Sequence, residues 1–320
     1  MSTRIVSVRL WGGLCNRLFQ IACCYGYAEK YNLTPIFYKS FFNHNDHTNQ
    51  DETIAILKEL IPHINISDEQ VNENNFYIIE VCGDFACKYI DLGLPPNDIM
   101  NKNILLKGYF QSEKYFPILE DNKFLLPFVN KLLTPEYNTN NPDTPDTPDN
   151  LNRYFIHIRL GDYEGHYLHY LGYRNYLQKA IEYILEKDNN NNLVFMICSN
   201  EKDKNKILKE IDFNSGETNS ILSRIKYEFE IDINPDLQPL QTLRNMTLCN
   251  GGGICLNSSF SWFGAYLSKL FKKVSSNIDN DILGEQIFIM PDKWFNERYI
   301  PKDSYKDIYP EWIDLTTCNI

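Results

Sequence analysis

The chain has 320 residues, of which 43% are hydrophobic and 14% aromatic, so it can bury a sizeable core. This composition excludes an intrinsically disordered protein, which is poorer in both classes of residue. The formal net charge of −11 argues against a general nucleic-acid binder, which carries a basic face, but is compatible with a local basic pocket for a phosphate.

Strands and helices are predicted to alternate from the start of the chain. Residues 4–10 are predicted to form a strand, residues 16–31 a helix after a glycine turn, and residues 35–38 a second strand. Residues 40–103 show no clear period. The stretch "NTNNPDTPDTPDNLN" at 138–152 predicts a linker or mobile loop, because its Pro-Asp and Asn repeats have no apolar face to pack.

The second half of the chain alternates more regularly. Strands are predicted at 154–159, 193–198, 225–229, 254–256 and 286–290, and helices at 173–186, 202–210, 237–248 and 261–271. Such alternation indicates a parallel sheet with helices on both faces. The predicted fold class is therefore α/β, with an N-terminal domain at 1–137 and a C-terminal Rossmann-like domain at 153–320.

A Gly-Gly turn stands between the first predicted strand and the first predicted helix, in "LWGGLCNRLFQIA". Gly12 and Gly13 let a ligand approach the backbone, and the amides at a helix start can bind an anion. The stretch matches neither the G-x-G-x-x-G nor the P-loop motif. The alternative interpretation is a tight strand-to-helix turn with Asn16 as the helix cap.

The stretch "HIRLGDY" at 157–163 follows an apolar strand. Side chains alternate along a strand, so His157 and Arg159 are expected to share one face. Ligands of open α/β sheets bind beyond the carboxyl ends of the strands, where the planar guanidinium of Arg159 would suit a diphosphate. The alternative is a surface salt bridge between Arg159 and Asp162.

A serine cluster stands at another strand-to-helix transition, in "LNSSFSWFGAYL" at 256–267. Ser258, Ser259 and Ser261 offer hydroxyl groups, and the helix start adds the positive end of its dipole. N-capping alone would account for one serine but not for three.

Two further patterns contain metal-ligand residue types, and neither predicts a metal site. His166 and His169 in "HYLHY" lack an evident third ligand. The Asp-Asn-Asp sequence at 279–281 has no buried strand before it and is interpreted as a turn. We therefore predict no metal.

Five stretches, in this order, resemble glycosyltransferase family 11, the inverting α-1,2-fucosyltransferases. They are "GGLCNRLFQIA", "GYFQSEKYF" (108–116), "HIRLGDY", "NSSFSWFGAYL" and "PDKWF" (291–295). The matches run across nearly the whole chain. The H-x-R-x-G-D and serine-tryptophan elements together are highly specific.

The resemblance implies a GT-B-like fold with two facing Rossmann-like domains, no essential metal or other cofactor, and a nucleotide-sugar donor, typically GDP-L-fucose. It implies transfer of a 6-deoxy-L-hexose to a glycan acceptor, with the acceptor bound by the N-terminal domain and the last residues of the chain packed back on that domain. Arg159, Asp162 and His157 are the implied catalytic residues. The implied donor-binding residues are Arg159 with Gly12, Gly13, Asn16, Asn257, Ser258, Ser259, Phe260 and Ser261.

The sequence departs from the family pattern at several positions, and these departures keep other functions open. Leu160 replaces the family's second arginine, Cys15 a glycine, Arg17 a glutamine and Phe263 a tryptophan. The alternatives are a rhamnosyltransferase using UDP- or dTDP-L-rhamnose, and a nucleotide-sugar-binding protein deficient in turnover. A phosphate-ester hydrolase ranks last because no nucleophile is evident. Asp162, Glu164 and His166 are all candidates for the general base.

The nine cysteines are scattered, odd in number and without a paired C-x-x-C spacing. They favour reduced, mostly buried thiols and a cytoplasmic location. The N-terminus does not resemble a signal peptide, and no apolar run is long enough for a transmembrane segment. No nucleic-acid partner is expected, and the sequence does not indicate an oligomeric state.

Overall fold

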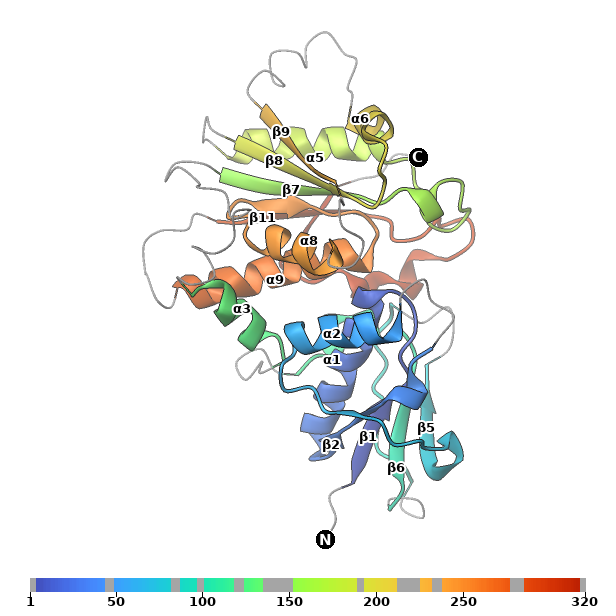
Figure 1. Ribbon diagram of the computed structural model, residues 1–320. Helices are drawn as coiled ribbons and strands as arrows, with labels where there is room; N and C mark the ends of the chain where they lie inside the picture. The colour runs from blue at the N-terminus through green and yellow to red at the C-terminus, as the bar shows by residue number, and fades with distance from the viewer. Residues whose placement is uncertain are drawn as a thin grey trace. The chain divides into compact units, whose positions relative to one another are not determined.

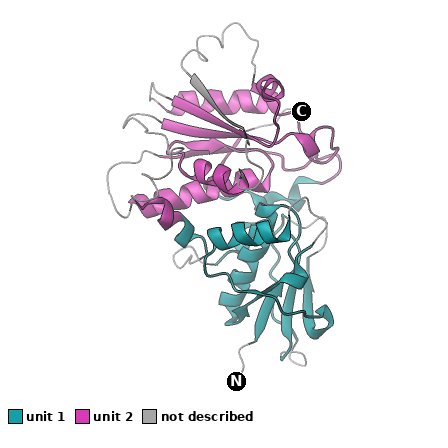
Figure 2. Ribbon diagram, viewed as in Figure 1, with its two compact units in different colours: residues 1–128, 301–310 teal, residues 129–300, 311–320 magenta. Residues whose placement is uncertain are grey.

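The computed structural model describes residues 4–43, 49–81, 87–96, 101–117, 124–134, 152–188, 193–211, 225–231, 238–276 and 285–316. The chain divides into two compact units (Figure 2). Unit 1 comprises residues 1–128 and 301–310, and unit 2 comprises residues 129–300 and 311–320.

The division differs from the predicted boundary at residue 137. It falls inside helix α3 (Leu126–Leu132), and residues 301–310 belong to unit 1 although they follow nearly all of unit 2 in the sequence. The predicted linker at 138–152 lies outside the described residues except for its last position.

Unit 1 contains a four-stranded parallel sheet in the order β2-β1-β6-β5. Its strands are β1 (Ile5–Val8), β2 (Thr34–Pro35), β5 (Phe76–Glu80) and β6 (Asn103–Lys107). Strands β3 (Phe37–Tyr38) and β4 (Ile66–Ser67) form a separate parallel pair. The predicted strand at 35–38 is therefore wrong as a single element, because its residues belong to two sheets.

The central strands of unit 1 are buried because their sequences are almost wholly apolar. Val6 and Val8 of β1 and the Ile-Leu-Leu run of β6 are inaccessible to solvent. Helix α1 (Leu14–Tyr31) contacts β1, and helix α2 (Gln50–Leu60) is capped by Asn49, whose side chain accepts the Asp51 N–H. Because the central strands are buried along their length, polar residues that could bind a ligand are expected beyond the carboxyl ends of these strands.

Unit 2 contains a six-stranded parallel sheet in the order β12-β11-β10-β7-β8-β9. Its strands are β7 (Asn152–Ile158), β8 (Leu193–Ser199), β9 (Ile225–Ile231), β10 (Gly252–Ile254), β11 (Ile287–Pro291) and β12 (Asp314–Thr316). The predicted α/β class, with parallel sheets in two units, is confirmed. Strand β12 was not predicted.

Helices cover both faces of the unit 2 sheet (Figure 1). Helices α5 (Tyr173–Lys187) and α6 (Lys204–Ile211) lie on one side, and α8 (Gln238–Thr247) and α9 (Ser259–Ser276) on the other. The buried face of α5 follows the three- and four-residue spacing of an amphipathic helix: Tyr173, Tyr176, Leu177, Ala180, Ile181 and Ile184. Within the described residues, no helix is both long and apolar enough to cross a membrane.

Candidate functional site

The predicted site residues of unit 2 lie at or beyond the carboxyl ends of two neighbouring strands, β7 and β10. These strands pair in parallel, with Ile156 opposite Ile254, so their carboxyl ends meet at the same edge of the sheet. Arg159 comes directly after β7, and Ser258 caps α9 a few residues after β10. The fold therefore brings the "HIRLGDY" and "NSSFSWFGAYL" stretches together.

His157 lies inside the protein, with 3% of its surface exposed. Its Nδ1 atom is 2.6 Å from the Ser261 hydroxyl oxygen, which also accepts the Leu256 N–H at 3.2 Å, and its ring stacks on Phe260. Burial, reinforced by the charge of Arg159, lowers the pKa of His157 to about 3, so the imidazole is neutral at pH 7. Its contacts join β7 to the first turn of α9, and its predicted catalytic role stays a prediction.

Arg159 is at the surface of unit 2, with 32% of its side chain exposed. Its Nη2 atom lies 2.9 Å from each carboxylate oxygen of Asp162, and its guanidinium carbon lies 5.4 Å from the centre of the Tyr163 ring. The salt bridge that was the alternative interpretation is thus present. An exposed ion pair contributes little to stability, so exchanging one of its partners for another charged group costs little.

The turn after Arg159 is held in place by Asn200, the residue that follows β8. The Asn200 side chain accepts the Leu160 N–H at 2.9 Å and donates to the Leu160 carbonyl at 3.0 Å, and Gly161 adopts a φ of +66°. The Leu160 side chain is 1% exposed and belongs to the hydrophobic core. A leucine rather than a second arginine at this position therefore adds core packing and no charge to the site.

Asn257 uses both polar atoms of its side chain within unit 2. Its Nδ2 donates to the carbonyls of His169 (2.9 Å) and Trp294 (2.8 Å), and its Oδ1 accepts the Tyr173 hydroxyl at 3.1 Å. These bonds tie the start of α9 to the loop after β7 and to the "PDKWF" stretch. The polar atoms of Asn257 are therefore engaged within unit 2, and its predicted part in donor binding stays a prediction.

Ser258 is the N-cap of α9. Its hydroxyl accepts the Phe260 N–H at 3.3 Å and its carbonyl accepts the Trp262 N–H at 3.0 Å, so capping accounts for this serine. Ser259 and Phe260 are partly exposed in the first turn. The helix dipole places partial positive charge there, on the same edge of the sheet as Arg159.

Aromatic side chains line the loop that follows Arg159. The Tyr163 ring stacks on His169 at 4.8 Å, and the rings of His166 and His169 are 4.7 Å apart. Burial and then the neighbouring His166 lower the pKa of His169 to about 4. Among the described residues no three His, Cys, Asp or Glu side chains form a metal-binding group; the Asp-Asn-Asp sequence at 279–281 lies outside them.

The predicted site residues of unit 1, Gly12, Gly13 and Asn16, follow β1 at the turn into helix α1 and in its first turn. Gly12 has a φ of +77°, and a Cβ atom there would come within 2.7 Å of Asn16 Nδ2. Gly13, not Asn16, is the N-cap of α1, so the capping interpretation of Asn16 is wrong. The Asn16 side chain instead accepts a 2.8 Å hydrogen bond from Gln111 of the "GYFQSEKYF" stretch.

Sequence reasoning missed Gln111, Asn200 and Tyr173 as supports of the two sites. Each is distant in sequence from the residue that it holds, so no local signal marks it. Gln111 follows Phe110, a non-glycine residue with a φ of +51°, and such a strained position often accompanies a functional site.

An arginine directly beyond a parallel strand, at the sheet edge where a helix starts, is an arrangement that can bind a phosphate group. The profile of Glycosyl transferase family 11 matches residues 99–281, more than half of the chain. The chain belongs to this family.

The chain is also 28% identical over 340 residues to the alpha-1,2-colitosyltransferase of Escherichia coli, covering 97% of this chain and 99% of that protein. Among solved structures it matches the fucosyltransferase NodZ from Bradyrhizobium, with 10% identity, 83% and 94% coverage and a TM-score of 0.44. It also matches an Arabidopsis thaliana FUT1 mutant in complex with GDP, with 12% identity, 82% and 68% coverage and a TM-score of 0.39. These two structural likenesses are too distant to bear on donor or acceptor.

Proposed function

We propose that the protein is an inverting glycosyltransferase that moves a 6-deoxy-L-hexose, L-fucose from GDP-L-fucose, onto a glycan hydroxyl in an α-1,2 linkage. The observation that carries the proposal is Arg159, a partly exposed cation placed beyond β7 at the edge where α9 begins. Family membership supplies the reaction class.

The geometry supports departure of a nucleoside diphosphate without help from a metal. When the bond between the anomeric carbon and the β-phosphate oxygen breaks, its electron pair stays on the diphosphate. Arg159 and the positive end of α9 are fixed groups that can stabilise this charge. The acceptor oxygen bonds to the anomeric carbon from the opposite face, which inverts its configuration.

The acceptor hydroxyl must lose its proton during the transfer, and we propose Asp162 as the base that takes it. Asp162 holds Arg159 at 2.9 Å in the absence of donor. A diphosphate that pairs with Arg159 would free this carboxylate for the acceptor. His157 is buried and bonded to Ser261, so its proposed part is to position the α9 turn.

Colitose, the 3-deoxy analogue of fucose, is the second candidate sugar, because the Escherichia coli relative is named a colitosyltransferase. The two sugars differ by one hydroxyl group. A site that hydrogen-bonds that hydroxyl would reject colitose strongly, whereas a site that does not would accept both.

The test is a transfer assay with purified protein, a neutral oligosaccharide acceptor and equal concentrations of GDP-L-fucose, GDP-colitose, UDP-L-rhamnose and dTDP-L-rhamnose. We expect GDP-L-fucose to give the highest kcat/KM, and the product linkage to be read by NMR. A higher kcat/KM for GDP-colitose would refute fucose as the transferred sugar but leave the assignment as a glycosyltransferase intact. Donor binding without transfer or hydrolysis would refute the proposal of an active enzyme and favour a nucleotide-sugar-binding protein. We also propose a cytoplasmic location, which the scattered, odd number of cysteines supports.

A further inference from the structure

A pocket of about 280 Å³ opens in unit 1 beside the second half of α1. We call it the tyrosine pocket, because Tyr27, Tyr31, Tyr89 and Tyr115 line it. Gly26, also in its lining, is 13 residues beyond Gly13, or about 20 Å along the helix. Helix α1 starts at the carboxyl end of β1 and runs back along the sheet, so this pocket is distinct from the Gly-Gly turn.

The walls of the tyrosine pocket are paired aromatic rings. Tyr27 and Tyr31 have ring centres 4.6 Å apart, and Tyr89 and Tyr115 have ring centres 4.9 Å apart. The Tyr27 hydroxyl donates to the Gly93 carbonyl at 2.7 Å, and the Tyr115 hydroxyl accepts the Ile90 N–H at 2.8 Å. These bonds hold the rings in place before a ligand arrives, which lowers the entropy cost of binding.

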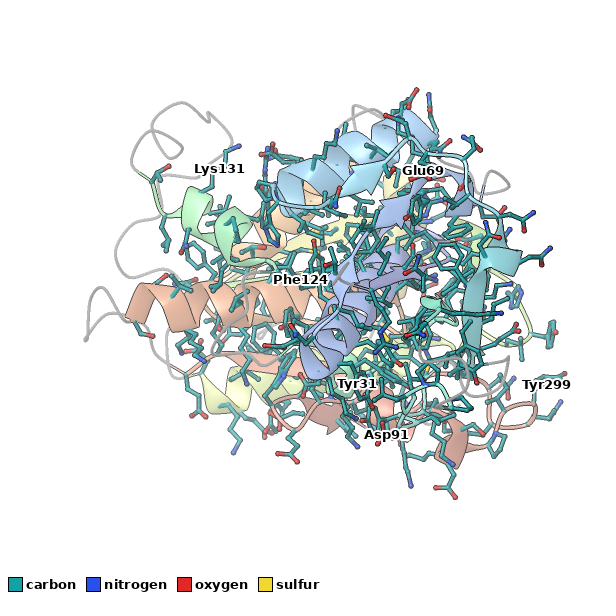
Figure 3. All side chains as sticks on the ribbon, turned by 90° about the horizontal axis from the view of Figure 1, so that it is seen from below. Tyr31, Glu69, Asp91, Phe124, Lys131 and Tyr299 are labelled. Carbon is teal, nitrogen blue, oxygen red and sulfur yellow. The ribbon has the colours of Figure 1, made fainter. Side chains whose placement is uncertain are left out.

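The two lysines in the pocket lining are each paired with a carboxylate. Lys30 Nζ lies 2.9 Å from Asp91, and Lys114 Nζ lies 2.5 Å from Asp307. Figure 3 shows Tyr31 and Asp91 near each other at this part of unit 1. Paired charges present donors and acceptors for hydrogen bonds without the excess positive charge that would select an anion.

We propose that the tyrosine pocket binds a neutral sugar ring, and thus gives the protein a saccharide site separate from the place of transfer. A pyranose has an apolar C–H face, which packs on a tyrosine ring, and a rim of hydroxyls, which bond to groups such as Lys30 and Asp91. The pocket is slightly smaller than the 300–1,000 Å³ or so typical of sites for drug-sized molecules, and this size suits a single ring. The site goes beyond the proposed transfer function, and its test needs no donor.

The experiment measures binding of methyl β-D-galactopyranoside, methyl β-D-glucopyranoside, methyl α-L-fucopyranoside and the anion glucuronate by saturation-transfer NMR, without nucleotide sugar. Tyr89→Ala removes one wall, and Leu92→Trp fills the pocket while leaving the four tyrosines in place. Tyr77→Ala is the matched control, because Tyr77 is a partly exposed tyrosine of β5 outside the pocket lining. Melting temperatures establish that each variant is folded.

We expect at least one neutral glycoside to bind with a Kd on the order of millimolar, more tightly than glucuronate. Tyr89→Ala and Leu92→Trp should weaken this binding by roughly three- to tenfold, while Tyr77→Ala and Arg159→Lys leave it unchanged. Absence of glycoside binding, tighter binding of glucuronate, or normal binding by folded Leu92→Trp would each overturn the proposal. Failure of the transfer assay would leave all these results standing.

Discussion

Replacing His157 tests whether the histidine of the "HIRLGDY" stretch is held neutral in the core. Its folded-state pKa is about 3, against an ordinary value near 6.5. Between these values the unfolded chain binds a proton that the folded chain does not, so stability is fully present above pH 6.5 and falls as the pH drops. A pH of 5 lies about 1.5 pH units below the pKa of the unfolded state, so the free energy of unfolding should fall by about 2 kcal/mol relative to pH 8.

The assay is urea unfolding of the wild type and of His157→Gln at pH 8 and pH 5. The variant should be less stable at both pH values, because the contacts with Ser261 and Phe260 change. Its loss between pH 8 and pH 5 should nevertheless be smaller than that of the wild type by about 2 kcal/mol. Ser261→Ala is the control, since it removes the hydrogen bond and keeps the imidazole. Its loss of stability between pH 8 and pH 5 should therefore match that of the wild type. An equal loss in wild type and His157→Gln would refute the claim that burial keeps this group neutral.

Four further outcomes are expected. Arg159→Lys should keep the wild-type melting temperature and lower the transfer rate by a factor on the order of 10²–10³, because lysine lacks the planar fork of donors. The control Arg298→Lys, at an exposed position, should keep both the melting temperature and the rate. Near-normal turnover of Arg159→Lys would contradict the proposed role of Arg159. Asp162→Asn should lower kcat more than donor affinity if Asp162 is the base, whereas a brace alone would mainly change donor affinity. Transfer should survive EDTA; loss that Mn²⁺ restores would contradict the metal-free mechanism. Leu160→Arg should lower stability by several kcal/mol, because it buries a charge in the core, and an unchanged melting temperature would show that the core can accommodate it.

Strands buried on both faces were the easiest elements to predict from the sequence. The run "LVFMIC" is continuous and apolar, and β8 indeed spans Leu193–Ser199 with every residue buried. Strand β12 was missed because it has only three residues, begins with a polar one and lies at the sheet edge. The return of residues 301–310 to unit 1 depends on tertiary contacts such as Lys114 with Asp307, which no local pattern records.

The alternation of side chains along β7 predicted that His157 and Arg159 share one face of the strand. It does not explain why only one of the two side chains is buried. Strand β7 ends at Ile158, so the strict alternation ends there as well. His157 remains inside the sheet at 3% exposure, while the Arg159 side chain is 32% exposed beside Asp162. The sequence therefore placed both residues at the end of β7 but could not separate the buried member of the pair from the accessible one.

The motif residues of unit 2 divide into a buried frame and an exposed ion pair, to which we have assigned the proposed chemistry. Asn257 and Ser261 have their polar atoms bonded to other parts of unit 2, and Ser258 caps α9. Arg159 and Asp162 instead bond to each other at the surface of unit 2, where both side chains are partly exposed. Stabilising the charge on a departing diphosphate requires donors that are already in place, because reorganising them during the reaction would raise the barrier. The buried frame meets this requirement by fixing the start of α9 against the end of β7, so substitutions within it should reduce transfer by displacing Arg159 rather than by removing a contact to the substrate.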